Sequence, residues 1–67
     1  MFEFWYDIVF FSYQDLDNFE DALIKHGIDY EIDGIYCDRL YIFGDWDDAD
    51  EAEWLMHLYC IEFYFIG

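Results

Sequence analysis

The sequence predicts an α+β fold in which two helices cover one face of a four-stranded antiparallel sheet. Two kinds of segment predict it: four stretches have the residue types or the alternation typical of strands, and apolar residues recur at helical spacing in two others. These stretches follow one another in the order β-α-β-β-α-β. The chain has 67 residues, no proline, no linker and no repeat, so we expect one domain spanning residues 1–67.

The first strand and the first helix are predicted from the N-terminal part of the chain. Residues Phe2–Phe11 are almost all aromatic or β-branched, as expected of a central strand. Ser12 is a suitable helix N-cap, with Asp15 at the third helical position. Gly27 is expected to end the helix, because glycine adopts the left-handed conformation that closes helices. The residues at helical spacing are Leu16, Phe19, Ala22, Leu23 and His26.

The second part of the chain predicts a hairpin, a helix and a last strand. Residues 28–33 alternate between apolar and acidic, which is typical of a half-exposed strand. Asp33-Gly34 is a hairpin signal, and Ile35–Phe43 is predicted as the returning strand. Asp45 is a suitable N-cap for the second helix, and Cys60–Ile66 is predicted as the last strand. The expected core face of that helix consists of Ala49, Ala52, Leu55, Met56 and Tyr59.

This order of elements is the ferredoxin-like arrangement, in which the sheet order is 4-1-3-2 and both helices pack on one face. The register of the third strand has two alternatives. A two-residue turn places Asp29 opposite Asp38, an unfavourable pair of like charges. A register shifted by one residue places Asp29 opposite Arg39. We favour this second register, with a β-bulge at Gly34.

The balance of charge is extreme, since 17 acidic residues accompany only two basic ones, Lys25 and Arg39, for a net charge of −15. The chain is also 27% aromatic, so it has the hydrophobic content to fold, unlike a disordered acidic tail. Direct binding of DNA, RNA or an anionic membrane is excluded, because lysine and arginine are what bind phosphates. The expected partner is therefore a basic protein.

The sequence also bears on the compartment. No basic region follows Met1, so we expect no signal peptide, and no apolar run is long enough to span a membrane. We expect Cys37 and Cys60 to be reduced and cytosolic. The sequence leaves open whether these cysteines have a role, and whether the protein is a monomer or a homodimer.

Acidic residues gather in three groups, which are the candidate contacts to a partner. The group at the start of the second helix would bind lysines and arginines of the partner, and one tryptophan would serve as an apolar anchor. The alternative is that these acids only cap the helix and are solvated. The group on the expected edge strand could instead prevent edge-to-edge aggregation, and both roles are compatible. The candidate partner-binding residues are Asp45, Trp46, Asp47, Asp48, Asp50, Glu51 and Glu53 in the second helix, Asp15, Asp17, Glu20 and Asp21 in the first helix, and Asp29, Glu31 and Asp33 on the strand.

Catalytic and metal-binding patterns are absent from the sequence. It contains no Gly-x-Ser-x-Gly, no P-loop and no glycine-rich dinucleotide turn, so we expect no enzyme and no cofactor. A calcium loop starting at Asp45 is excluded, because Met56 stands where a bidentate glutamate is needed. The histidines and cysteines fit no zinc pattern. Trp5, Tyr41 and Tyr64 are expected on the open face of the sheet, either in a protein contact or dimer interface, or partly buried.

As a type, the chain resembles small acidic phage-encoded inhibitors that imitate nucleic acid, especially anti-CRISPR proteins. Duplex DNA carries about one negative charge per 1.7 Å, so this net charge matches roughly 25 Å of duplex. The resemblance implies an inhibitor that acts in the cytoplasm of an infected bacterium. It would bind the basic surface of a defence protein, for instance the DNA- or PAM-binding surface of a Cas effector complex, and compete with DNA. The alternative is an acidic adaptor or antitoxin-like module that binds a basic partner without imitating DNA.

Overall fold

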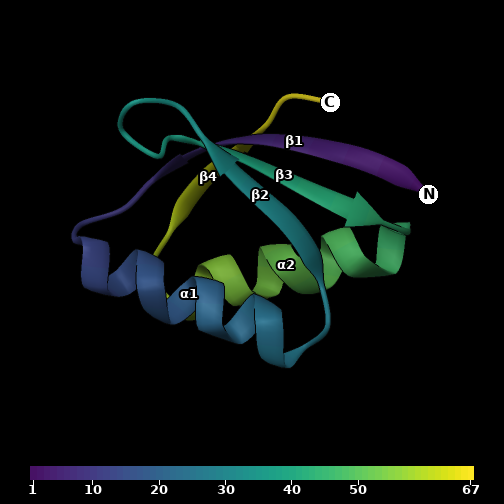
Figure 1. The fold of residues 1–67 in the computed structure, drawn as a ribbon, viewed down its shortest axis with the longest axis horizontal. Helices are drawn as coiled ribbons and strands as arrows, with labels where there is room; N and C mark the ends of the chain where they lie inside the picture. Colours follow the sequence, from purple (N-terminus) through teal and green to yellow (C-terminus); the bar gives the residue numbers. More distant parts are fainter.

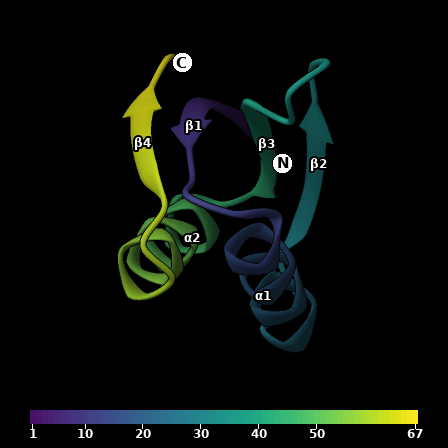
Figure 2. The ribbon, with the colours of Figure 1, turned by 90° about the vertical axis from the view of Figure 1, so that its left-hand side faces the viewer.

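The computed structural model describes all 67 residues and has the predicted α+β architecture. The four strands form one antiparallel sheet in the order β2-β3-β1-β4, which confirms the ferredoxin-like prediction. Both helices lie side by side against one face of this sheet, and the other face is open (Figure 2). The elements are β1 (Phe2–Val9), α1 (Tyr13–Lys25), β2 (Asp29–Asp33), β3 (Arg39–Gly44), α2 (Trp46–Leu58) and β4 (Glu62–Phe65).

One apolar core lies between the sheet and the helices. It contains 15 buried residues, none of them polar or charged. Strand β1 contributes Phe4, Tyr6 and Ile8, because alternate side chains of a strand point to the same face. The helix residues predicted to face inward are buried, except His26, which is the exposed C-cap of α1, and Tyr59, which is half-buried. The buried helix residues are Leu16, Phe19, Ala22 and Leu23 of α1, and Ala49, Ala52, Leu55 and Met56 of α2.

Both predicted helix starts are confirmed. The Ser12 hydroxyl accepts a hydrogen bond from the Asp15 N–H at 3.3 Å, which satisfies one of the free donors at the start of α1. Asp45 is the N-cap of α2, and its own N–H donates to the Asp48 carboxylate at 2.9 Å. Gly27 follows the cap of α1 with φ +69°, as predicted. Short-range chemistry therefore sets where each helix begins and where α1 ends.

The predicted strand Ile35–Phe43 is wrong in its first part, since β3 begins at Arg39 and residues 34–38 form a loop. Both registers considered from the sequence are also wrong, because Asp29 lies opposite Phe43 and Arg39 lies opposite Asp33. No bulge forms at Gly34. That glycine opens the loop at φ +94° and donates its N–H to the side chain of Asp33 at 2.8 Å. The outer strands are shorter than predicted too, as their bounds show.

Burial explains the observed register. Ile32 pairs with Leu40, and Tyr30 pairs with Ile42, so two fully buried β3 side chains lie in the core. The favoured register would have placed Asp38 opposite the inward-facing Tyr30, and burial of a carboxylate without a partner is costly. The longer loop leaves Asp38 exposed instead.

The two helices run antiparallel. Figure 1 shows the start of α1 at the end of the molecule that holds the β2–β3 loop, and the start of α2 at the opposite end. The principal extents are 30 × 23 × 16 Å. The acidic first turns of the helices consequently lie at opposite ends of the molecule.

Candidate functional site

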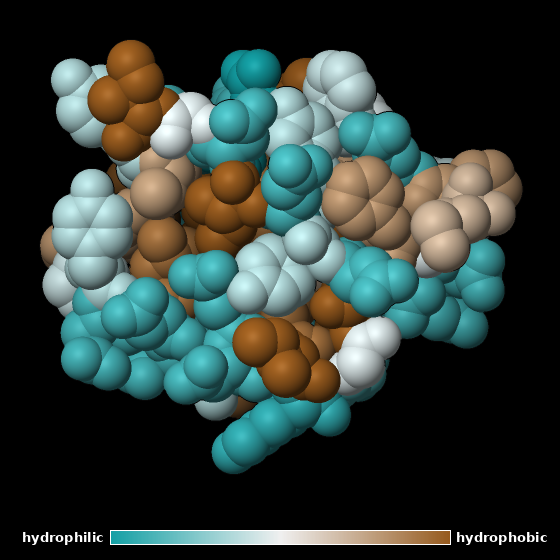
Figure 3. Space-filling view, viewed as in Figure 1, coloured by the Kyte–Doolittle hydropathy of each residue, from teal (hydrophilic) through white to brown (hydrophobic).

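All 17 carboxylates lie at the surface, since no charged residue is buried. Helices and strands packed on an apolar core hold them in place. Figure 3 shows hydrophilic residues spread over the helix layer, with isolated apolar residues between them. Charge of one sign on both layers gives the protein a negative field in all directions.

Four exposed aspartates of the two helices have no partner within the protein. None of the side-chain hydrogen bonds or ion pairs involves them. The two helices that carry these carboxylates lie side by side in one layer (Figure 2). We call these four side chains the helix-layer carboxylates: Asp17 and Asp21 of α1, and Asp47 and Asp50 of α2.

Three candidate glutamates already have partners in the fold. The Tyr6 hydroxyl donates to Glu53 at 2.7 Å, which ties β1 to α2. The Tyr30 hydroxyl donates to Glu20 at 2.9 Å, which ties β2 to α1. Glu51 Oε1 lies 2.9 Å from His26 Nδ1, which joins the two helices. These glutamates are half-buried, so their charge adds to the surface field while their geometry serves the fold.

The two tyrosines titrate abnormally. Burial is the main reason that the pKa of Tyr6 lies well above its ordinary value, and the hydrogen bond to Glu53 raises it further. The pKa of Tyr30 rises to about 12 for the same reasons, burial first and then the hydrogen bond to Glu20. Both hydroxyls therefore remain donors at neutral pH, and a negative partner beside each one opposes its ionisation.

The start of α2 combines capping with free charge. Asp48 is half-buried and used by the cap, as described above, whereas Asp45 is exposed. Trp46 is 61% exposed, yet its ring packs edge-on against Phe4 with 4.8 Å between centroids. The predicted anchor is thus fixed at its base and open to solvent above. In α1, Asp15 is half-buried in the first turn, where a carboxylate suits the helix dipole.

Edge strand β2 presents the third group. Asp29, Glu31 and Asp33 are all exposed, and they alternate with inward-facing residues. Asp33 lies opposite Arg39, whose Nε is also 3.5 Å from Asp7 Oδ1 on the other side. One arginine between two carboxylates leaves the open face of the sheet negative overall.

The three aromatic residues predicted for the open face do lie there. Trp5 pairs directly with Tyr41 across β1 and β3, and their rings meet edge to face with centroids 5.4 Å apart. Tyr64 of β4 lies opposite Asp7 of β1 and is 62% exposed. Acidic neighbours make this face unsuitable for stacking nucleic-acid bases, because they repel phosphate.

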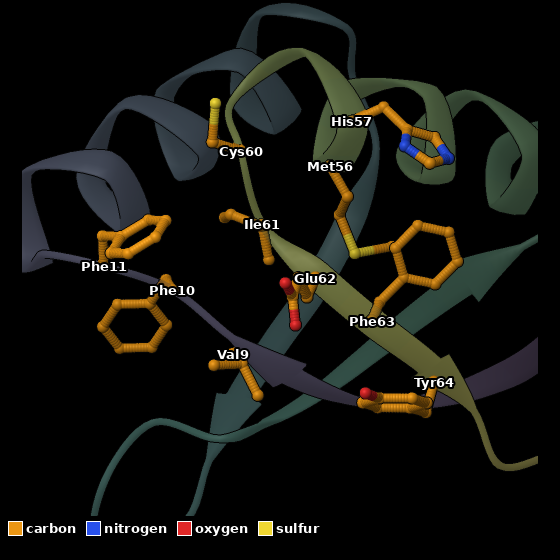
Figure 4. A pocket seen from close by; sticks show the side chains of 10 residues that line it. All are labelled: Val9, Phe10, Phe11, Met56, His57, Cys60, Ile61, Glu62, Phe63 and Tyr64. Carbon is orange, nitrogen blue, oxygen red and sulfur yellow. The ribbon is translucent and has the colours of Figure 1, made fainter.

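Sequence reasoning missed an apolar groove beside edge strand β4. It has a volume of about 820 Å³, and Figure 4 shows its lining on both sides of the strand. Phe10 and Phe11 line it from the β1–α1 connection, and Met56 and His57 line it from α2. The only signal in the sequence was the lack of charge in the last strand, where Glu62 is the single charged residue.

The side chains that could bind a metal do not converge. No group of three His, Cys, Asp or Glu side chains has a geometry that could hold an ion. Cys37 is half-buried and Cys60 is exposed, and both are free thiols. Neither helix is long and apolar enough to cross a membrane.

Comparison with known proteins gives no family. No protein-family model matches the chain, and no curated protein matches its sequence.

Proposed function

We propose that this protein is a nucleic-acid mimic that occupies the basic DNA-binding surface of a bacterial defence protein or complex and competes with DNA. An anti-restriction or anti-CRISPR factor acting in the cytoplasm of an infected bacterium fits this description. The observation that carries the proposal is the placement of every carboxylate of a −15 chain on the surface of a small folded domain.

The linear density of charge supports mimicry. The longest extent of the molecule is 30 Å, so it carries about one net charge per 2 Å, against about one per 1.7 Å of duplex DNA. A small soluble domain needs a net charge of only about 2–8 for solubility. Solubility therefore does not explain the excess of negative charge. A partner protein with a phosphate-binding surface is complementary to this charge.

The helix-layer carboxylates are the proposed core of the contact. Asp17, Asp21, Asp47 and Asp50 would pair with lysines and arginines that otherwise hold DNA phosphates, as charge-assisted hydrogen bonds. Long-range attraction would accelerate the encounter and make it sensitive to salt. Trp46, exposed in the first turn of α2 next to Asp47, would supply an apolar anchor.

Competition by DNA is the primary test. The tagged protein is incubated with bacterial lysate at low salt, and bound proteins are eluted first with duplex DNA and then with salt. Mimicry predicts that DNA releases a DNA-binding protein or complex. A partner that only salt releases, or one that never binds DNA, would contradict the proposal.

Two matched variants locate the contact on the molecule. One replaces the helix-layer carboxylates by asparagine, and the other neutralises four exposed acids of the sheet and its loop: Glu3, Asp29, Glu31 and Asp38. Both remove the same amount of charge, so a field effect alone would weaken target binding equally. A contact through the helices predicts a larger loss for the helix variant, and equal losses would refute that placement.

A second function is supported by a different feature. The groove beside β4 and the aromatic residues of the open face offer apolar contacts that a phosphate backbone lacks. They favour an acidic adaptor or antitoxin-like module that binds a basic protein without imitating DNA. Binding that resists DNA competition would identify this alternative.

A further inference from the structure

The two edges of the sheet differ in how they are protected. Strand β2 exposes Asp29, Glu31 and Asp33, and charged side chains of this kind discourage pairing with another strand. Strand β4 has one acidic residue, Glu62, and its other exposed residues are apolar or aromatic, including Tyr64 at 62% and Phe65 at 52%. The β4 edge is therefore the one at which a further strand can add.

The backbone of β4 has free hydrogen-bonding groups on this edge. The Trp5 N–H donates to the Gly67 carbonyl at 2.7 Å. The backbone N–H and C=O groups of every second residue of β1, starting from Trp5, therefore point toward β4. The β4 residue opposite such a position is Tyr64, which consequently directs its backbone groups toward β1. By alternation, the N–H and C=O groups of Phe63 and Phe65 point away from the sheet.

An apolar groove accompanies these free groups. Figure 4 shows Phe63 and His57 on one side of β4, and Phe10 and Phe11 beyond its start. Residues of an added strand would alternate between this groove and the open face of the sheet. Side chains directed to the helix side of the groove would meet Met56 and Phe63 and should be apolar, whereas Glu62 and Tyr64, which also line the groove, lie on its open-face side.

Charge decides which strand fits. A second copy would bring another −15 chain against this one, which like-charge repulsion opposes. On the open-face side, the added strand would lie beside Glu62 and the exposed ring of Tyr64, and both attract lysine or arginine. A basic segment is complementary both to this edge and to the whole protein.

We propose that the β4 edge is a strand-addition site for an extended segment of the basic partner, in which lysine or arginine alternates with apolar residues. The apolar side chains fill the groove, and the basic ones lie beside Glu62 and Tyr64. This inference rests on the proposed function, because it takes the partner to be a basic protein.

A synthetic peptide tests this site without the natural target. The probe alternates lysine with valine or isoleucine, and its control has the same residues arranged as a lysine block followed by an apolar block. Strand addition predicts that the alternating peptide binds about tenfold tighter, a difference comparable to the burial of one valine side chain, because only its side chains alternate between the groove and the open face. It also predicts that the peptide slows hydrogen exchange of the Phe63 and Phe65 amides. Equal affinities, or unchanged exchange at both amides, would overturn the proposal.

Variants of Phe65 separate the backbone from the side chain. Phe65→Pro removes an outward N–H, which an edge strand tolerates, and Phe65→Ala removes the ring but keeps the donor. We expect the proline variant to bind the alternating peptide more weakly than the alanine variant, and equal binding would overturn strand addition. A native mass showing dimers that Phe65→Pro dissociates, and to which the peptide does not bind, would assign this edge to a second copy and overturn the proposal as well.

The two proposals fail in different experiments. Loss of DNA competition in the lysate experiment contradicts mimicry and leaves the peptide result standing. Failure of the peptide experiment removes the strand-addition site and leaves the helix-layer contact intact.

Discussion

Replacing Tyr6 by phenylalanine should loosen the link between β1 and α2 without creating a cavity. The Tyr6 side chain is fully buried, and its ring packs against Phe63 and Phe65 with centroids 5.7 and 5.4 Å away. Phenylalanine preserves these ring contacts. The variant loses only the hydroxyl and its 2.7 Å hydrogen bond to Glu53.

The expected loss follows from the nature of that bond. A hydrogen bond to a charged group contributes about 1.5–3 kcal/mol net to stability. Glu53 is half-buried, so water can replace the hydroxyl in the variant, and the loss should fall at the lower end. We expect the free energy of unfolding to decrease by about 1.5–2 kcal/mol.

Urea unfolding followed by tryptophan fluorescence measures this change. The matched control is Tyr30→Phe, which removes a 2.9 Å bond to Glu20 at the partly exposed sheet edge and should cost less. Equal stability of Tyr6→Phe and the wild type would show that the bond contributes nothing to the fold. A loss well above about 3 kcal/mol would show that the ring packing had changed, and would refute the reasoning from the hydrogen bond.

Three further predictions concern pH, salt and backbone. Because folding raises the pKa of Tyr30 from 10.0 to about 12, the stability that its protonated hydroxyl contributes is complete below pH 10 and is lost between pH 10 and 12. Urea unfolding across this range should therefore show a smaller decrease in the free energy of unfolding for Tyr30→Phe than for the wild type. Added salt should raise the melting temperature, because it shortens the reach of repulsion among the carboxylates to about 10 Å at 0.1 M, and a flat or falling salt series would contradict this. Gly44→Ala should lower the free energy of unfolding by about 1–3 kcal/mol. The reason is that Gly44 has φ +150°, and a Cβ there would meet the Asp48 carboxylate that caps α2. An unchanged urea midpoint would refute this prediction.

The sequence predicted the fold because each element carries its own local signal. Ser12 and Asp45 mark helix starts, Gly27 marks a helix end, and the aromatic and β-branched residues of Phe2–Phe11 mark the first strand. The β2–β3 loop was mispredicted because Asp33-Gly34 is a strong local turn signal. The register was decided instead by burial of Leu40 and Ile42 and exposure of Asp38, and those contacts exist only in the folded protein.

The candidate site, like the fold, was only partly predictable from the sequence. Composition alone established that the surface must be acidic, since a core cannot bury unpaired carboxylates. The positions of Trp5, Tyr41 and Tyr64 in the predicted strands placed them on the open face. The sequence could not distinguish acids that serve the fold from acids that are free. Glu53, Glu51 and Glu20 meet partners far along the chain, whereas the helix-layer carboxylates meet none.

The sequence by itself thus determined the class of fold, the ends of the helices and the sign of the surface, because propensity, capping and charge act within a few residues. Only the tertiary structure decided the hairpin register, the internal partners of the glutamates and the apolar groove beside β4. These features depend on segments distant in sequence, and packing on a common core brings those segments together.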